Sequence, residues 1–230
     1  MKKIVSFGDS FVYGSEIPGN VNGSCAWPAL IAKSIGAEYK TFADPGCGND
    51  SIGKQIYEYF CSNPAEDTLA VINWTWISRW DIYLANHETW LTLGPTCDSA
   101  KLKRKLNMTN GHELVDFYQK YANGSLLWNK FRCLQTIFAA QQYMKVKGIA
   151  SVQTYMDPHL FATDWHAPDY VQELQNLVRE PMLTWDGQNF LDWSYSNGHA
   201  VTPIGIHPLQ SAHDHAAEFW KELYIRLLSA

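Results

Sequence analysis

The chain has 230 residues, of which 46% are hydrophobic, and this is enough to bury a sizeable core in a single domain. Its 18 basic and 23 acidic residues give a net charge of −5, which excludes a general electrostatic attraction to nucleic acids or anionic membranes. We therefore expect small or neutral partners.

The N-terminus and the cysteines predict a cytoplasmic protein. The apolar run after Met1-Lys2-Lys3 is interrupted at Ser6 and again at Gly8, so it is too short for the core of a signal peptide. No stretch approaches the roughly 20 apolar residues of a membrane span. The five cysteines are odd in number and include no Cys-x-x-Cys pair, which favours a reducing compartment and predicts neither disulfides nor a cysteine-based zinc site.

The chain opens with a short buried strand. Ile4, Val5 and Phe7 are followed at once by the triplet Gly8-Asp9-Ser10. A strand that ends in these residues before a helix can start brings the Ser10 hydroxyl to the carboxyl end of a sheet. Open α/β sheets bind their ligands at this end.

Strand, glycine-containing loop and helix then recur along the first third of the chain. In order, the patterns predict a loop over 11–23, a helix over 27–35, a strand over 38–42, a glycine-rich loop over 43–50, a helix over 51–60 and a strand over 69–73. The pattern weakens over 81–123, which we interpret as an insertion with one short helix near 113–121, because it is longer than a usual crossover. Such an insertion can build a lid or a substrate-selecting wall.

The C-terminal half continues the alternation. It predicts a helix over 125–147, a strand over 149–155, a loop-rich region over 156–198 with a helix at 170–178, and a final helix over 209–228. Alternating strands and helices favour a parallel sheet covered on both faces. We therefore predict one domain over 1–230 with an α/β fold, a three-layer α/β/α sandwich around a mostly parallel, flavodoxin-like sheet.

Two motifs near opposite ends of the chain resemble the GDSL/SGNH hydrolase family. Gly8-Asp9-Ser10 is similar to the family's block I, and this resemblance implies that Ser10 is the nucleophile. His207-Pro208, just before the last predicted helix, is similar to the family's catalytic His and implies that His207 is the base. The Gly-x-Ser-x-Gly elbow of the α/β-hydrolases is absent.

A third motif supplies an oxyanion hole. Pro45-Gly46-x-Gly48-Asn49 resembles block II, in which a glycine after the second strand gives its backbone N–H to the oxyanion, and this implies Gly46. Glycine suits this position because the carbonyl of a substrate must approach the main chain closely. The backbone N–H of Ser10, at the start of a helix, is expected to be a second donor.

Two family positions are replaced. The usual Gly-x-Asn-Asp after the third strand is missing, so Thr75 occupies the Asn position, or Asn73 does if the register slips by two. A third oxyanion donor is therefore expected from Thr75, with Asn73 as the alternative.

The second replacement concerns the acid of the triad. Ile204 stands where the family has an Asp three residues before the His. Without a carboxylate the imidazole is less well oriented and less basic. A backbone carbonyl or a carboxylate from another loop could take its place, the candidates being Asp157, Asp186 and Asp192.

Other polar residues have simpler interpretations. Arg79 is interpreted as forming a salt bridge at the rim, with recognition of a substrate carboxylate as the alternative. Cys47 is interpreted as a packing residue. His213 and His215 are two apart on a predicted helix and face different directions, so we predict no metal and no cofactor.

These features predict a serine esterase or related acyl hydrolase, with Ser10 and His207 catalytic and Ser10, Gly46 and Thr75 around the oxyanion. Most of the ten Trp and twelve Tyr are expected in the core, and the remainder suggest stacking on sugar rings, hence an O-acetylated carbohydrate as substrate. The alternatives are a sugar O-acyltransferase that uses the same residues and a non-catalytic carbohydrate-binding protein on a hydrolase scaffold.

Overall fold

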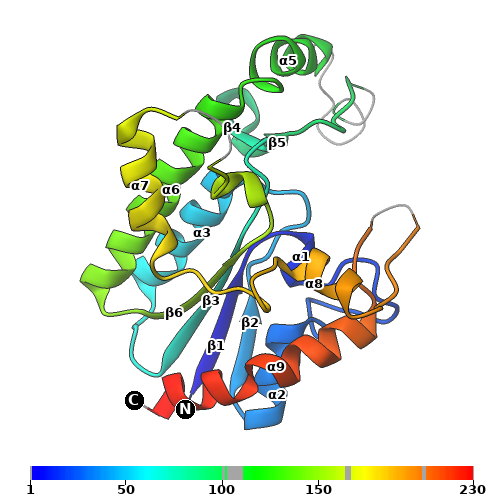
Figure 1. The fold of residues 1–230 in the computed structure, drawn as a ribbon, viewed down its shortest axis with the longest axis vertical. Coiled ribbons are helices and arrows are strands. Elements are labelled where there is room, and N and C mark those ends of the chain that lie inside the picture. Colours follow the sequence, from blue (N-terminus) through cyan, green and yellow to red (C-terminus); the bar gives the residue numbers. More distant parts are fainter. Residues whose placement is uncertain (1, 100–101, 103–110, 164–166, 204–205, 230) are drawn as a thin grey trace.

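A parallel four-stranded sheet forms the centre of the computed structural model, which describes residues 2–99, 102, 111–163, 167–203 and 206–229 (Figure 1). The strands are β1 (Lys3–Phe7), β2 (Glu38–Thr41), β3 (Thr68–Trp74) and β6 (Ala150–Tyr155), in the spatial order β2-β1-β3-β6. This is the order of the first four strands of a flavodoxin-like sheet. The predicted fold class is confirmed.

Helices cover both faces of the sheet, which makes three layers (Figure 1). α3 (Asn49–Ser62), α6 (Leu126–Lys147) and α7 (Asp169–Arg179) lie on one face, and α2 (Trp27–Ile35) and α9 (Gln210–Ser229) lie on the other. Side chains of a strand alternate between the two faces. Accordingly Val5 and Phe7 pack under α3 and α6, whereas Ile4 packs under α2 and α9.

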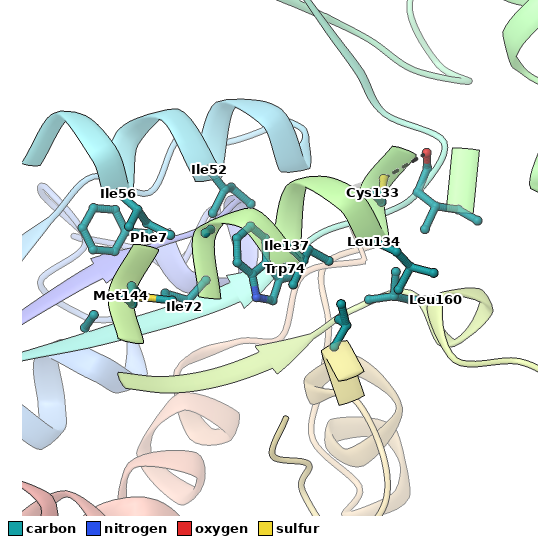
Figure 2. Packing of buried hydrophobic residues seen from close by; sticks show 14 of the residues in the cluster. Phe7, Ile52, Ile56, Ile72, Trp74, Cys133, Leu134, Ile137, Met144 and Leu160 are labelled. Atoms are coloured by element: carbon teal, nitrogen blue, oxygen red, sulfur yellow. Dashed lines mark hydrogen bonds between the residues drawn. The ribbon is translucent and has the colours of Figure 1, made fainter. Parts of the chain in front are cut away.

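The core on the α3 and α6 side reaches the carboxyl end of the sheet. Figure 2 shows Phe7, Ile72 and Trp74 from the sheet packed with Ile52 of α3 and Ile137 of α6, all fully buried. Burying a side chain of this size stabilises the fold by about 1.5–3 kcal/mol. The indole N–H of Trp74 donates to Gln153 Oε1 at 3.1 Å, so its polar atom is satisfied as well. Rigid packing therefore continues to the point where β3 enters the loop that begins at Thr75.

The local predictions agree with these elements to within about two residues at each end, and two regions outside the 81–123 segment hold more structure than predicted. α1 (Ser10–Tyr13) opens the segment that was expected to be a loop over 11–23. The loop-rich region contains the 3-10 helix η3 (Pro158–Leu160) and α8 (Phe190–Ser196). All three added elements are short, and short elements depend on packing more than on their own sequence pattern.

The weakly patterned segment contains a hairpin that the sequence did not predict. β4 (Trp80–Leu84) pairs antiparallel with β5 (Thr89–Leu93) around the 3-10 turn η1 (Ala85–His87). The single helix expected near 113–121 is α5 (Gly111–Phe117), continued by the π-helical turn η2 (Tyr118–Ala122). These elements lie beyond the carboxyl ends of the sheet strands (Figure 1). That the chain is one domain over 1–230, with residues 81–123 as an insertion, stays a prediction.

Among the helices that the structure describes, none is both long and apolar enough to cross a membrane. The described core buries part of the large aromatic side chains, while others pack against it partly buried or are exposed. The buried tryptophans are Trp27, Trp74, Trp185, Trp193 and Trp220.

Candidate active site

Ser10 lies at the carboxyl end of β1, where the sequence predicted it. Gly8 makes the turn possible, because its φ is +153° and a Cβ there would lie 2.9 Å from Val12 Cγ2 and 3.0 Å from the carbonyl oxygen of Asn73. Asp9 then caps α1 by accepting a hydrogen bond from Phe11 N at 3.0 Å. The resulting turn leaves Ser10 only 5% exposed.

The loop that carries Gly46 lies against the turn that carries Ser10. Asp44 N donates to Gly8 O at 2.9 Å, and the thiol of Cys47 donates to the same oxygen at 3.3 Å. Gly46 has a φ of +90°, and a Cβ there would meet nothing within 4 Å, so the space above it is open. Within the described part of the chain, the N–H groups of Ser10 and Gly46 donate to no acceptor. Two uncommitted donors therefore stand on neighbouring loops.

A part-buried ion pair joins these two loops. Asp9 is fully buried, and its Oδ2 accepts from Arg79 Nη1 at 2.8 Å. The same Nη1 lies 3.0 Å from the carbonyl oxygen of Cys47. The salt-bridge interpretation of Arg79 is confirmed, with the difference that its partner Asp9 is fully buried. Arg79 thus ties the residue before Ser10 to the residue after Gly46.

The two candidates for a third oxyanion donor are engaged by protein groups. The Thr75 hydroxyl donates to Asp9 Oδ2 at 2.6 Å and accepts from Arg79 Nη1 at 2.7 Å. The Asn73 side chain accepts from Thr154 Oγ1 at 2.9 Å. A donor role for Thr75 stays a prediction, and it requires the hydroxyl to leave Asp9.

Asn49, which the sequence offered only as part of a motif, holds the backbone of Thr75. Its Oδ1 accepts from Thr75 N at 2.8 Å, and its Nδ2 donates to Thr75 O at 3.2 Å. The side chain thus pairs with the peptide much as a neighbouring strand would. The end of β3 is thereby fastened to the start of α3.

His207 reaches the same end of the sheet from the C-terminal part of the chain. Its ring centroid lies 5.1 Å from that of Phe11, the residue after Ser10. Its loop is closed by Thr202, whose N–H donates to His207 O at 2.9 Å and whose hydroxyl accepts from His207 N at 3.1 Å. Within the described residues no hydrogen bond joins the Ser10 hydroxyl to the His207 ring, and such bonds often form fully only with substrate bound. The catalytic pair stays a prediction.

The far nitrogen of His207 has a carboxylate partner that the sequence reasoning missed. His207 Nδ1 lies 3.0 Å from Glu16 Oε2, and the Thr202 hydroxyl donates to the same oxygen. These two hydrogen bonds lower the pKa of Glu16 below its ordinary value. The bond from Thr202 has the larger effect and the bond from His207 the smaller one. No motif marks Glu16, because it lies about 190 positions from its partner.

The three carboxylates considered from the sequence have other roles or contacts. Asp157 accepts from Ile77 N and from His159, and Asp192 accepts from Asn189 Nδ2. Asp186 occupies a turn with a φ of +51°. None of them hydrogen-bonds to His207 in the described part of the structure, and Ile204 lies outside that part.

The remaining candidates from the sequence, Cys47 and the histidines near the C-terminus, contact other protein groups. Burial raises the pKa of the Cys47 thiol well above its ordinary value, which leaves it protonated and supports the packing interpretation. His213 is buried and accepts from Trp27 N at 3.1 Å, whereas His199 Nε2 lies 3.0 Å from His215 Nδ1. In the described residues, no cluster of three or more potential metal ligands occurs.

No protein-family profile and no curated protein matches the sequence. Solved structures do match it. A member of the lipolytic protein G-D-S-L family from Veillonella parvula DSM 2008 has 13% identity and a TM-score of 0.53, covering 98% of this chain and 100% of its own. TesA has 14% identity and a TM-score of 0.52, with coverages of 98% and 99%. The psychrotrophic esterase EstA from Pseudoalteromonas sp. has 9% identity and a TM-score of 0.51, with both chains fully covered. This chain therefore has the fold of the GDSL/SGNH hydrolases.

Proposed function

We propose that the protein is a serine esterase that cleaves carboxylic esters through an acyl-enzyme. The observation that supports it is the meeting of distant chain segments at one end of the sheet. The His207 ring packs on Phe11, the residue after Ser10, and the N–H groups of Ser10 and Gly46 are uncommitted on two loops that lie against each other. A nucleophile, a base and oxyanion donors are the parts that ester hydrolysis needs.

The reaction follows from these groups. Ser10 Oγ attacks the carbonyl carbon of the ester while its proton passes to His207 Nε2, and the electron pair of the C=O bond moves onto oxygen. The N–H groups of Ser10 and Gly46 stabilise the oxyanion. Collapse of the tetrahedral intermediate breaks the bond to the alcohol, which leaves with the proton from His207. Water then repeats the sequence, releases the acid and restores the Ser10 hydroxyl. These steps use no cofactor.

Thr75 is proposed as the third donor to the oxyanion. Its hydroxyl would turn from Asp9 toward the substrate oxygen as charge develops there. Loss of one such donor costs about 10²–10³ in rate in enzymes that depend on it. An intact Asp9–Thr75 hydrogen bond throughout the reaction would leave two backbone donors and a slower enzyme.

Replacement of the nucleophile tests the proposal. Ser10→Ala is expected to lower the release of p-nitrophenol from p-nitrophenyl acetate by about 10³ or more, because no other group can form the acyl-enzyme. Ser62→Ala, an exposed change at the end of α3, is the matched control. Circular dichroism checks that both variants fold. Equal activity of Ser10→Ala and the wild type would refute the mechanism.

Two further measurements separate the alternatives. A fluorophosphonate probe reacts only with an activated serine, so labelling of Ser10 would exclude a non-catalytic carbohydrate-binding protein. Product analysis with and without a sugar acceptor distinguishes hydrolysis from acyl transfer. The proposal of an O-acetylated carbohydrate substrate derives from the aromatic content, of which Trp90 and Trp128 are exposed on the described surface. Comparison of p-nitrophenyl acetate with an O-acetylated oligosaccharide tests that preference.

A further inference from the structure

We infer that Glu16 is the positioning residue that holds the His207 ring for catalysis. The inference rests on the proposed function, since it assigns a role within the same site. Glu16 comes from the loop after α1, at the opposite end of the chain from His207. The nucleophile and the carboxylate would thus share one N-terminal segment, and the base would come from the C-terminal one.

Three hydrogen bonds define the orientation of the ring. Glu16 Oε2 faces His207 Nδ1 at 3.0 Å, the Thr202 hydroxyl donates to the same carboxylate oxygen, and His207 N donates to Thr202 Oγ1 at 3.1 Å. Thr202 therefore links the carboxylate to the backbone of the histidine. An Nδ1–H that donates to Glu16 leaves Nε2 as the ring nitrogen free to accept a proton.

The loop that carries Glu16 is anchored to the nucleophile. Ser15 N donates to Ser10 O at 3.0 Å. The side chain of Asn20 donates to Tyr13 O at 2.7 Å and to Gly14 O at 2.8 Å. These contacts fix the loop on both sides of Glu16. The carboxylate is consequently held at a set place relative to Ser10.

The backbone is strained on both sides of the contact. Glu16 has a φ of +65°, and Ile206, immediately before His207, has a φ of +52°. Left-handed conformations are unfavourable for residues other than glycine, and most of all for a β-branched residue such as isoleucine. Each such residue costs of order 1–3 kcal/mol, and such strain clusters at functional sites. Strain at both partners indicates that the surrounding structure imposes this contact.

The exposure of the pair sets the size of the expected effect. The side chain of Glu16 is 43% exposed and that of His207 is 17% exposed. Water therefore screens the carboxylate more than it screens the buried acid of a serine protease, where loss of the charge lowers kcat by about 10⁴. We expect a loss of about tenfold to a hundredfold in kcat for this chain.

The decisive variant is Glu16→Gln, which keeps the shape and a hydrogen-bond acceptor but removes the charge. It is expected to lower kcat for p-nitrophenyl acetate by about tenfold to a hundredfold, with KM and the melting temperature unchanged. Glu16→Asp, which restores the charge, is expected to recover part of the activity. Glu58→Gln, a surface change on α3, is the charge-matched control and is expected to behave as wild type. A wild-type kcat in Glu16→Gln would overturn the inference.

A measurement without turnover tests the contact itself. Carbon-13 NMR titration of the Glu16 carboxyl is expected to give a pKa below the ordinary value in the wild type, because Thr202 and His207 stabilise the anion. His207→Ala and Thr202→Val are each expected to raise it. A Glu16 pKa that neither variant moves would overturn the inference even if the enzyme is active.

Probe labelling separates failure of this inference from failure of the proposed function. Slower fluorophosphonate labelling of Ser10 in Glu16→Gln than in the wild type supports a role in activating the nucleophile. Equal labelling rates overturn the inference alone. No labelling in the wild type overturns the proposed function and the role of Glu16 with it, whatever the NMR titration shows.

Discussion

Asp9 is a fully buried carboxylate whose charge is balanced by three hydrogen-bond donors. Phe11 N reaches its Oδ1, and Thr75 Oγ1 and Arg79 Nη1 reach its Oδ2. A buried charge is tolerated only when it is paired and hydrogen-bonded. The stability of the buried Asp9 carboxylate therefore depends on Arg79 more than an exposed carboxylate depends on its partner. The position of the neighbouring Ser10 depends on both residues.

Removal of the guanidinium tests this dependence. Arg79→Met keeps most of the volume but leaves Asp9 without its counter-charge, and we expect it to lower the free energy of unfolding by about 3 kcal/mol. Urea unfolding measures this value. In the double variant Asp9→Asn with Arg79→Met, the loss should be smaller than the sum of the two single losses, because the uncompensated charge is gone. Additive losses would show that the two residues do not interact.

At the scale of elements, α3 is capped by a residue of the hairpin. Gly48, which precedes α3, makes no side-chain cap, and Asp81 of β4 takes that role. Its carboxylate accepts from Gly48 N at 3.0 Å and from Ser51 N at 2.8 Å. A Cβ on Gly48 would lie 2.5 Å from Asp81 Oδ2, so this position requires glycine because of close approach. The hairpin and the Gly46 loop are thus fastened together.

Asp81→Asn probes the cap. An asparagine offers one acceptor oxygen where two N–H groups need partners, so one of these donors would face an NH₂ group. We expect the free energy of unfolding to fall by about 1–2 kcal/mol. Asp116→Asn, on an exposed side chain of α5, provides the comparison and should change little. Equal unfolding curves for the two variants would contradict the cap.

At the scale of the whole molecule, the candidate site exists only when the C-terminal helix packs on the N-terminal half. Gln210 Nε2 donates to Cys25 O at 3.2 Å, and His213 accepts from Trp27 N at 3.1 Å, so the start of α9 is bonded to the start of α2. His207 lies just before this junction. Loosening of α9 would therefore separate His207 from Ser10 and Glu16.

His213 makes this junction sensitive to acid. Burial, as the largest cause, lowers the pKa of His213 to about 3, whereas an unfolded histidine titrates near 6.5. Above about pH 6.5 the ring is neutral in both states, and its contribution to stability is fully present. Below that, the unfolded chain takes up a proton that the folded chain excludes, so stability is lost progressively down to about pH 3, by at most about 1.4 kcal/mol per pH unit.

Unfolding measured between pH 7 and pH 4 checks this expectation. His213→Asn keeps an acceptor for Trp27 N but does not titrate, so its stability should depend less on pH than that of the wild type. His87→Asn, an exposed change in η1, should retain the wild-type dependence. A pH dependence of His213→Asn equal to that of the wild type would show that His213 does not carry the effect.

Local patterns in the sequence were sufficient to predict the sheet strands and the long helices. The four sheet strands, the five long helices and the position of Ser10 after β1 follow from apolar periodicity and from stops such as Gly36 and Gly148, which act between neighbouring residues. The hairpin β4–β5 escaped prediction because its strands are short and half exposed, so their pattern is weak.

The polar contacts of the candidate site were decided by the tertiary structure alone. Glu16 meets His207, Arg79 meets Asp9, and Asp81 caps α3 across separations of 30 to 191 positions. A hydrogen bond between residues so far apart produces no periodic pattern in the sequence, because each partner is an ordinary polar residue within its own segment. Only the packing of both ends of the chain onto one sheet decides which carboxylate faces which donor. For this reason the sequence by itself indicated a serine and a histidine, and only the fold brought Glu16 beside that histidine.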